Sequence, residues 1–341
     1  MTVTRRALLH TGLAVTALPA LGINASADVV PTGLPLAAPT IVTCDEWGAR
    51  QPSEPIQMLD HRPTYIVVHH TATPNADDIS RDHAVRLAHS IQDFHMDSRG
   101  WIDSGQQLTN TRGGYLMEGR RRSVEAVANG HEHVQGANVA DHNSEVIGIE
   151  NEGTYSTEDA PGALWDSLVK AVVLIARQYG IAPAEIRGHR DFNATECPGK
   201  VLYGRLPELR DAVGAELAKP VDQPAVLPLL SPNDSGTIVR AAQHLLRDRG
   251  YPLATDGMYG SATVDAVRAF TIRAGLPYQP CYGTRSADER HLIGAPTWSA
   301  LVRPVDLADG SEAAAAARLL DPARGSAGRV EIRDWLTMLS R

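Results

Sequence analysis

The sequence of 341 residues is short of three things: cysteine, long apolar runs and net positive charge. After residue 27 no stretch is long and apolar enough to cross a bilayer, so we expect no transmembrane segment. The formal net charge of −8 argues against a nucleic-acid partner, because phosphate groups favour basic surfaces. The length of the chain after residue 27 suits two domains.

Residues 1–27 have the composition of an export signal. Arg5 and Arg6 precede a modestly apolar run, and residues 25–27 (ASA) supply a small-residue cleavage site. Arginines paired after a threonine resemble the twin-arginine signal, which exports folded proteins, and an ordinary secretory signal is the alternative. Loss of this segment removes both arginines and takes the net charge from −8 to −10. We therefore expect a secreted protein, exported by the twin-arginine pathway.

Only three cysteines are present, Cys44, Cys197 and Cys281. Outside the cytosol thiols tend to be paired or otherwise protected, and an odd number leaves at least one that needs another explanation. Cys197 lies in the stretch GHRDFNATECPG (188–199), eight residues after His189. Because NATECP bends the chain back, the histidine and the cysteine can converge on one point.

Residues 42–218 are predicted to form an α/β domain with a mixed sheet flanked by helices. Segments rich in proline and small residues, 28–41 and 219–232, precede and follow it as linkers. Apolar runs and helical periodicity predict strands over 64–70 and 145–151, and helices over 80–96 and 161–179.

The chain after the second linker is predicted to be all-helical. Apolar periodicity predicts helices over 237–250, 261–275 and 296–302. We expect a small three-helix domain over 233–303, followed by a tail over 304–341. The tail is predicted to mix an alanine-rich helix with a glycine-rich break, and the sequence assigns it no function.

A paired histidine, His69 and His70, ends the first predicted strand, where side chains leave the core and enter a cleft. A solvated loop histidine is the alternative for such a pair. One of these histidines, together with His189 and Cys197, would give three ligands of a His/His/Cys site. Such a set leaves the fourth tetrahedral position of Zn²⁺ open, as in catalytic rather than structural zinc sites.

These residues belong to a wider resemblance. Residues 44–217 are similar to the zinc-dependent N-acetylmuramoyl-L-alanine amidases of the peptidoglycan recognition protein and phage-lysozyme type. The similarity implies cleavage of the amide between N-acetylmuramic acid and the first L-alanine of the peptide stem, with one catalytic zinc held by His69, His189 and Cys197. The matching stretches, in family order, are WGAR, IVVHHTAT, GWIDSG, HVQGAN, VIGIENEG and GHRDFNATECPG.

One departure from the family bears on the mechanism. Many members carry a catalytic tyrosine directly after the glycine of the GWxDxG stretch, whereas this chain has Gln106 there. An amide is not a useful proton acceptor at neutral pH. Another branch, involved in recycling wall fragments, has IGIELEG with a glutamate near the zinc, and Glu150 of IGIENEG corresponds to it. We expect Glu150 to act as the general base towards a zinc-activated water, with a strand-end salt bridge as the alternative.

The resemblance also suggests the surroundings of the metal. Thr195 or His133 is expected to donate a hydrogen bond to the oxyanion of the tetrahedral intermediate. Side chains expected to bind substrate are His70, Thr71, Asn138, His142 and Asn143. For His142 and Asn143, which lie in a short insertion, a plain surface loop is the alternative.

Residues 234–302 resemble the three-helix peptidoglycan-binding module of wall hydrolases, most specifically in DGMYGSAT (256–263). Such a module would hold the first domain near an insoluble polymer. A longer segment between its second and third helices contains Cys281. Once Cys197 is assigned to zinc, Cys44 and Cys281 could form a disulfide.

We therefore expect a monomeric hydrolase of peptidoglycan or muropeptides, extracellular or associated with the cell wall. The main alternative is a recognition protein that binds muropeptide without cleaving it. Recognition-only relatives tend to lose the metal-binding cysteine, whereas this chain has Cys197. A zinc endopeptidase that cuts within the peptide stem is a further alternative.

Overall fold

The computed structural model of the protein describes residues 37–278 and 288–341. The predicted signal 1–27, most of the linker 28–41 and Cys281 lie outside the described residues. Within the described ranges no helix has the length and apolar character needed to cross a bilayer.

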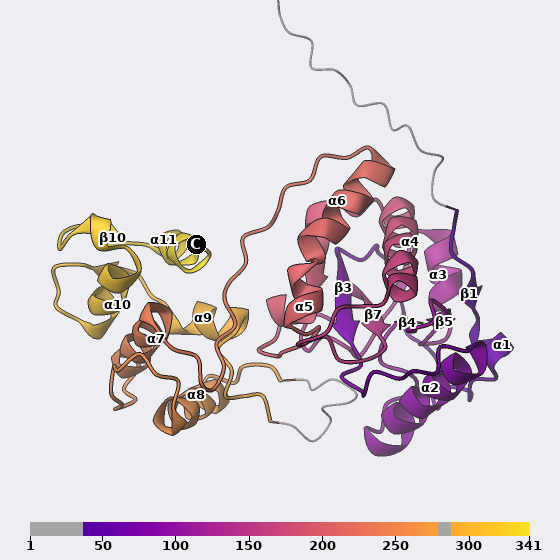
Figure 1. The fold of residues 1–341 in the computed structure, drawn as a ribbon, viewed down its shortest axis with the longest axis horizontal. Coiled ribbons are helices and arrows are strands. Elements are labelled where there is room, and N and C mark those ends of the chain that lie inside the picture. The colour runs from indigo at the N-terminus through magenta and orange to yellow at the C-terminus, as the bar shows by residue number, and fades with distance from the viewer. Residues whose placement is uncertain (1–36, 279–287) are drawn as a thin grey trace, which may run out of the picture. The chain divides into compact units, whose positions relative to one another are not determined.

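A six-stranded sheet forms the centre of the first domain (Figure 1). Only β4 and β5 are antiparallel, and the other neighbouring strands run parallel. This arrangement confirms the predicted α/β class with a mixed sheet. In order across the sheet the strands are β1 (Ile41–Val42), β5 (Leu116–Glu118), β4 (Leu108–Asn110), β7 (Val146–Asn151), β3 (Tyr65–His70) and β8 (Ile186–Gly188).

The two central strands, β3 and β7, pair in register over their whole length, from Tyr65 opposite Val146 to His70 opposite Asn151. Their apolar runs are buried on both faces, as predicted for strands in the middle of a sheet. Side chains alternate between the faces. Ile66 therefore packs on the face covered by α4, and Val67 packs on the opposite face.

Helices cover both faces of the sheet (Figure 1). On one face lies α4 (Gly162–Tyr179), which buries its leucine and valine stripe, contacts α6 (Leu206–Leu217), and ends at Gly180 with a φ of +78°. On the other face lies α2 (Arg81–Asp93), whose buried alanines pack near Met117 of β5. Ser80 caps α2 by accepting a hydrogen bond from the backbone N–H of His83.

Shorter elements connect this framework. A five-residue π-helix, η1 (Phe94–Ser98), continues α2, and a two-stranded sheet pairs β2 (Met58–Leu59) with β6 (His133–Val134). The others are α1 (Cys44–Trp47), α3 (Ser123–Asn129), η2 (Pro183–Glu185), η3 (His189–Asp191) and α5 (Lys200–Gly204).

The C-terminal helical unit is larger than expected. The three predicted helices are present as α7, α8 and α9, but the segment predicted as a tail adds α10 and α11 to the same core. Small side chains such as Ala313 and Ala317 let α10 pack closely on α7, and Trp335 of α11 is fully buried. The elements are α7 (Thr237–Asp248), α8 (Ser261–Arg273), α9 (Ala295–Leu301), β9 (Val305–Asp306), α10 (Glu312–Leu320), η4 (Pro322–Arg324), β10 (Arg329–Val330) and α11 (Ile332–Leu339).

Candidate metal centre

Three potential metal ligands, His69, His189 and Cys197, meet at one edge of the sheet. The neighbouring parallel strands β3 and β8 end there, which brings His69 and the start of η3 to the same place. The loop after η3 returns, and the Arg190 N–H donates to the Cys197 carbonyl at 3.1 Å. One donor atom from each ligand lies within 4.8 Å of the others, and all three side chains are buried.

The donor set fits zinc. Two imidazole nitrogens and a thiolate sulfur are ligands that Zn²⁺ prefers, and three protein ligands are typical of catalytic zinc sites. Zinc bonds of about 2.1 Å to nitrogen and 2.3 Å to sulfur at a tetrahedral angle put these two atoms about 3.6 Å apart. The distance from His69 Nδ1 to Cys197 Sγ is 3.7 Å.

An asparagine fixes the orientation of His189. Its Nε2 lies 3.0 Å from Asn193 Oδ1, which also accepts the backbone N–H of Ala140. Because this oxygen can only accept, Nε2 of His189 carries the proton and Nδ1 keeps its lone pair for a metal. Sequence reasoning missed Asn193, although it stands four residues after His189 in the same motif.

The histidines near this edge are held neutral by burial. Burial lowers the pKa of His69 well below its usual value, and it lowers the pKa of His189 to about 4. Nearby imidazoles add to the effect on His69. A neutral imidazole is the form that binds a metal, so these ligands are ready to bind at neutral pH without losing a proton.

Glu150 lies beside the metal ligands. Residue pairing puts it directly opposite His69 on β3, and paired residues in neighbouring strands point to the same face. The side chain is buried, and Oε2 has no hydrogen-bond partner among the described residues. Burial alone raises the pKa of Glu150 to about 8. A carboxyl group of this kind can both take up and release a proton near neutral pH.

Gln106 and Thr195 are also buried near this edge. The Gln106 amide donates from Nε2 to Thr109 Oγ1 at 2.8 Å. Thr195 Oγ1 accepts the backbone N–H of Cys197 at 3.2 Å, so the threonine braces the loop that carries this ligand.

His133 lies away from the three ligands, contrary to its predicted role as an oxyanion donor. Its Nδ1 is 2.8 Å from the carbonyl oxygen of His61, in the loop that enters β3. His61 precedes β3, so His133 lies where this strand begins, whereas His69 lies where it ends.

Two predicted substrate-binding residues, His70 and Thr71, contact the backbone of neighbouring loops, and their substrate-binding role stays a prediction. His70 points to the face covered by α4, because it follows His69 in the strand, and its Nδ1 accepts the backbone N–H of Tyr155 at 3.4 Å. The Thr71 hydroxyl accepts the backbone N–H of Gly153 at 2.8 Å. Both side chains are buried.

The insertion before β7 is held by two asparagines. Asn143 Oδ1 accepts the backbone N–H groups of Asn138 and Val139. Asn138 in turn lies over Gly148 of β7, where a side-chain carbon would come within 2.4 Å of Asn138 Oδ1. His142 is partly exposed and packs against Phe192 at a ring separation of 5.0 Å. Substrate binding by these three polar residues stays a prediction.

Cys44 is a buried thiol whose Sγ lies 3.4 Å from the carbonyl oxygen of Gly119. Burial and the nearby Glu118 carboxylate raise its pKa far above the usual value, so it stays protonated. Its predicted disulfide partner, Cys281, lies outside the described residues.

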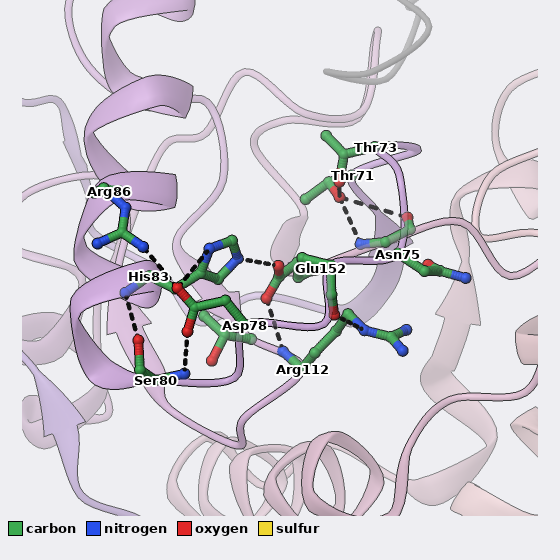
Figure 2. A network of polar contacts seen from close by, with 12 residues as sticks. Thr71, Thr73, Asn75, Asp78, Ser80, His83, Arg86, Arg112 and Glu152 are labelled. Carbon is green, nitrogen blue, oxygen red and sulfur yellow. Dashed lines mark hydrogen bonds and ion pairs between the residues drawn. The ribbon is translucent and has the colours of Figure 1, made fainter.

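A second polar cluster, which sequence reasoning missed, adjoins the end of β7 (Figure 2). Glu152 is buried, and its carboxylate lies 2.5 Å from His83 Nε2 and accepts the backbone N–H of Arg112 at 2.8 Å. The guanidinium of Arg112 donates from Nε to the carbonyl of Ala76. The cluster therefore joins β7, the first turn of α2 and the loop after β3.

The first domain is therefore an α/β domain with a candidate metal centre. Its mixed sheet brings two histidines and a cysteine together at the ends of parallel strands. Residues 59–200 match the family model described as "N-acetylmuramoyl-L-alanine amidase". Residues 235–278 match the family model described as "Putative peptidoglycan binding domain". The chain therefore contains a domain of the amidase family followed by one of the peptidoglycan-binding family, which confirms the resemblance of its motifs.

Named proteins are similar to part of this chain. Peptidoglycan-recognition protein SC2 of Drosophila melanogaster is 28% identical over 175 residues, which cover 49% of this chain and 84% of the relative. N-acetylmuramoyl-L-alanine amidase of Sus scrofa is 31% identical over 180 residues, which cover 50% of this chain and 27% of the relative. The solved structure of wild-type Drosophila PGRP-LB is 27% identical and covers 50% of this chain and 93% of that chain, with a TM-score of 0.44.

Proposed function

We propose that this protein is a secreted hydrolase with one catalytic Zn²⁺ ion, and that it cleaves the amide bond between N-acetylmuramic acid and L-alanine in peptidoglycan. The observation that carries the proposal is the convergence of His69, His189 and Cys197 in a buried cluster. A protein that only recognises muropeptide needs no such donor set. The amidase and peptidoglycan-binding family matches supply the substrate class.

In this proposal the three ligands hold the ion, and Asn193 orients His189. Zinc supplies a Lewis acid that polarises the amide carbonyl and makes water more acidic. Glu150 accepts a proton from the attacking water at its carboxylate and returns it to the leaving amine of L-alanine. Thr195 takes the oxyanion-donor role, since His133 lies at the other end of the strands.

The second domain has a supporting role. Weak binding by the C-terminal helical unit to the wall polymer would raise the local concentration of the first domain around its substrate. Export by a twin-arginine signal is part of the proposal, because peptidoglycan lies outside the cytoplasm. Replacing Arg5 and Arg6 by lysine tests this part, and the expected result is protein retained in the cytoplasm.

Digestion of purified peptidoglycan tests the proposed reaction. We expect new N-terminal L-alanine to be released, and both a chelator and Cys197→Ala to abolish its release. Cys44→Ala is the matched control, since Cys44 is equally buried but lies outside the metal centre, and it should keep activity. Tight binding without released amine would show a recognition protein instead. New N-termini from within the stem would show an endopeptidase.

A further inference from the structure

The C-terminal helical unit carries a hollow of about 420 Å³ between α7 and α10, which pack side by side (Figure 1). This volume is in the range of sites that bind small molecules. Because α10 lies in the segment predicted as a tail, the predicted three-helix domain alone would lack one wall of the hollow. None of the described residues that line it carries a carboxylate. They are Arg240, His244, Thr255, Ala315, Arg318 and Leu319.

Two arginines in the hollow have charges that the protein leaves unpaired. The carboxylate nearest to the wall, that of Glu312, already pairs with His244 Nδ1 at 2.5 Å and with Arg247 Nε at 2.7 Å. Arg240 on α7 and Arg318 on α10 make no ion pair with any described residue. The hollow therefore has two positive charges available for a ligand.

Both arginine side chains are held in place by the surrounding backbone. Nη1 of Arg318 donates to the carbonyl of Leu307 at 2.6 Å, and the other N–H groups of the guanidinium are left to bind a ligand. Arg240 lies against Gly257 of the DGMYGSAT motif, where an added side-chain carbon would come within 3.7 Å of the arginine Cβ and Nε. The two arginines thus extend from the two helices into one hollow.

Two aspartates lie near the hollow, but each serves its own loop. The charge of Asp256 reaches Arg240, and the charge of Asp309 reaches Arg318. Each aspartate accepts the backbone N–H two residues further along the chain, at 2.8 Å and 2.7 Å respectively. Neither carboxylate lines the hollow or pairs with its arginines.

The chemistry of the lining points to an anionic ligand. A guanidinium group binds a carboxylate or a phosphate through parallel hydrogen bonds and by charge. Ala315, Leu319 and the apolar stems of the arginines supply a surface for the uncharged part of such a ligand. The whole chain has a net charge of −8, so this hollow is not part of a generally basic protein.

We propose that the hollow between α7 and α10 binds a carboxylate group of the peptide stem of peptidoglycan, held by Arg240 and Arg318. This inference rests on the proposed function, in which the C-terminal helical unit binds the wall polymer. The match of residues 235–278 to a peptidoglycan-binding family favours this source, because a peptide stem that is not cross-linked ends in a free carboxylate. The segment 304–341 then contributes Arg318 to binding as well as α10 to the core.

Co-sedimentation of the zinc-loaded full-length protein with purified peptidoglycan, briefly and on ice to limit digestion, tests the proposal. The peptidoglycan is first freed of phosphodiester polymers. We expect Arg240→Gln and Arg318→Gln each to weaken binding about fivefold, and the double variant about 20-fold, because each change removes a charge-assisted hydrogen bond at a partly exposed site. A double variant that binds as tightly as the wild type would overturn the inference.

Two further arms identify the ligand. When the carboxyl groups of the peptidoglycan are converted to neutral amides, wild-type binding should fall to the level of the double variant. Unchanged wild-type binding to the amidated polymer would overturn the inference. Weaker binding of the double variant only to peptidoglycan that still carries phosphodiester polymers would show a phosphate ligand instead, and would also overturn it.

The matched control removes two arginines from the same unit outside the hollow. The side chains of Arg329 and Arg341 are each 64% exposed, and the double variant Arg329→Gln, Arg341→Gln should bind like the wild type. Equal weakening by this control would show that overall charge, not the hollow, sets the affinity. If Arg318→Gln does not fold, Arg240→Gln decides, because the Arg240 side chain forms no hydrogen bond with a described residue.

The parent proposal can fail separately. A wild-type protein that does not sediment with peptidoglycan would remove the wall-binding role of the C-terminal helical unit, and this inference would fall with it. Wild-type sedimentation together with full binding by the double variant of the hollow would overturn only the inference.

Discussion

We expect Asn193 to influence the affinity of the candidate metal centre without being one of its three ligands. Asn193 Oδ1 accepts from His189 Nε2 at 3.0 Å and is itself held by the backbone N–H of Ala140. We predict that Asn193→Ala weakens zinc binding about 10- to 100-fold, because the imidazole loses the partner that fixes its tautomer and orientation. Competition with a chromogenic chelator measures this change. An affinity equal to that of the wild type would contradict the assigned role of Asn193.

Glu150 links stability to pH in the metal-free protein. Its pKa is about 8 in the folded chain, whereas the ordinary pKa of a glutamate is 4.5. Between these values the unfolded chain releases a proton that the folded chain keeps, so the free energy of unfolding falls as pH rises. We predict that Glu150→Gln removes this loss and stabilises the metal-free protein above pH 8 by at most about 5 kcal/mol.

Denaturant unfolding of both metal-free proteins from pH 5 to 9 measures the difference. The exposed Glu54→Gln is the control and should unfold like the wild type at every pH. Parallel pH profiles of the free energy of unfolding for wild type and Glu150→Gln would show that burial does not raise the pKa of Glu150. A group that costs stability in the metal-free protein and yet serves the proposed reaction is expected at a functional site.

At the scale of elements, the sequence predicted β3, β7, α2 and α4 because each carries a long, regular apolar pattern. It also predicted the three residues that converge at the strand ends. The sequence did not show that His70 faces the side of the sheet covered by α4, because adjacent residues of a strand face opposite sides. His133 was misplaced because the short pairing of β6 with β2 joins segments far apart in the chain, which no local pattern reveals.

The cluster around Glu152 ties three elements together at the end of β7. Its carboxylate accepts from the backbone of Arg112 and contacts His83 of α2 (Figure 2). We predict that Glu152→Ala destabilises the protein by about 2–3 kcal/mol, because it leaves a buried N–H and an imidazole without their acceptor. Denaturant unfolding of the full chain gives the value.

The matched control for Glu152 lies in the same cluster but on the surface. Asp78 pairs with Arg86 at 2.7 Å, and both side chains are about half exposed or more. Asp78→Asn should therefore change the free energy of unfolding by less than about 1 kcal/mol. Equal effects of the two substitutions would show that the buried contacts of Glu152 stabilise the protein no more than the exposed ion pair of Asp78 does.

For the whole molecule, the principal difference from expectation is the size of the C-terminal helical unit. Its fourth helix, α10, is rich in alanine, and four alanines on it are buried against the rest of the core. Alanine is a weak marker of a buried face, because it is common on both sides of a helix. The sequence therefore predicted a domain of the three helices with large apolar residues. It also predicted an alanine-rich helix within 304–341, but not that this helix packs on the same core.

This packing predicts that the last segment is required for the unit to fold. Removing residues 304–341 would expose the face of α7 that contacts α10 and would delete Trp335, which is fully buried and donates from Nε1 to the Arg303 carbonyl at 2.7 Å. We expect the shortened chain to lose the cooperative unfolding of its C-terminal unit and to be cut there rapidly by protease.

Thermal unfolding and limited proteolysis, with the fragments identified by mass, test this expectation. Trp335→Ala should weaken the unit by about 3–5 kcal/mol, whereas Ile332→Ala on the same helix should have little effect, since Ile332 is 41% exposed. A shortened chain whose C-terminal unit unfolds cooperatively at the wild-type temperature would show that the three predicted helices fold without residues 304–341. Loss of the C-terminal transition, with the transition of the first domain unchanged, would show that the C-terminal helical unit comprises five helices and folds separately from the first domain.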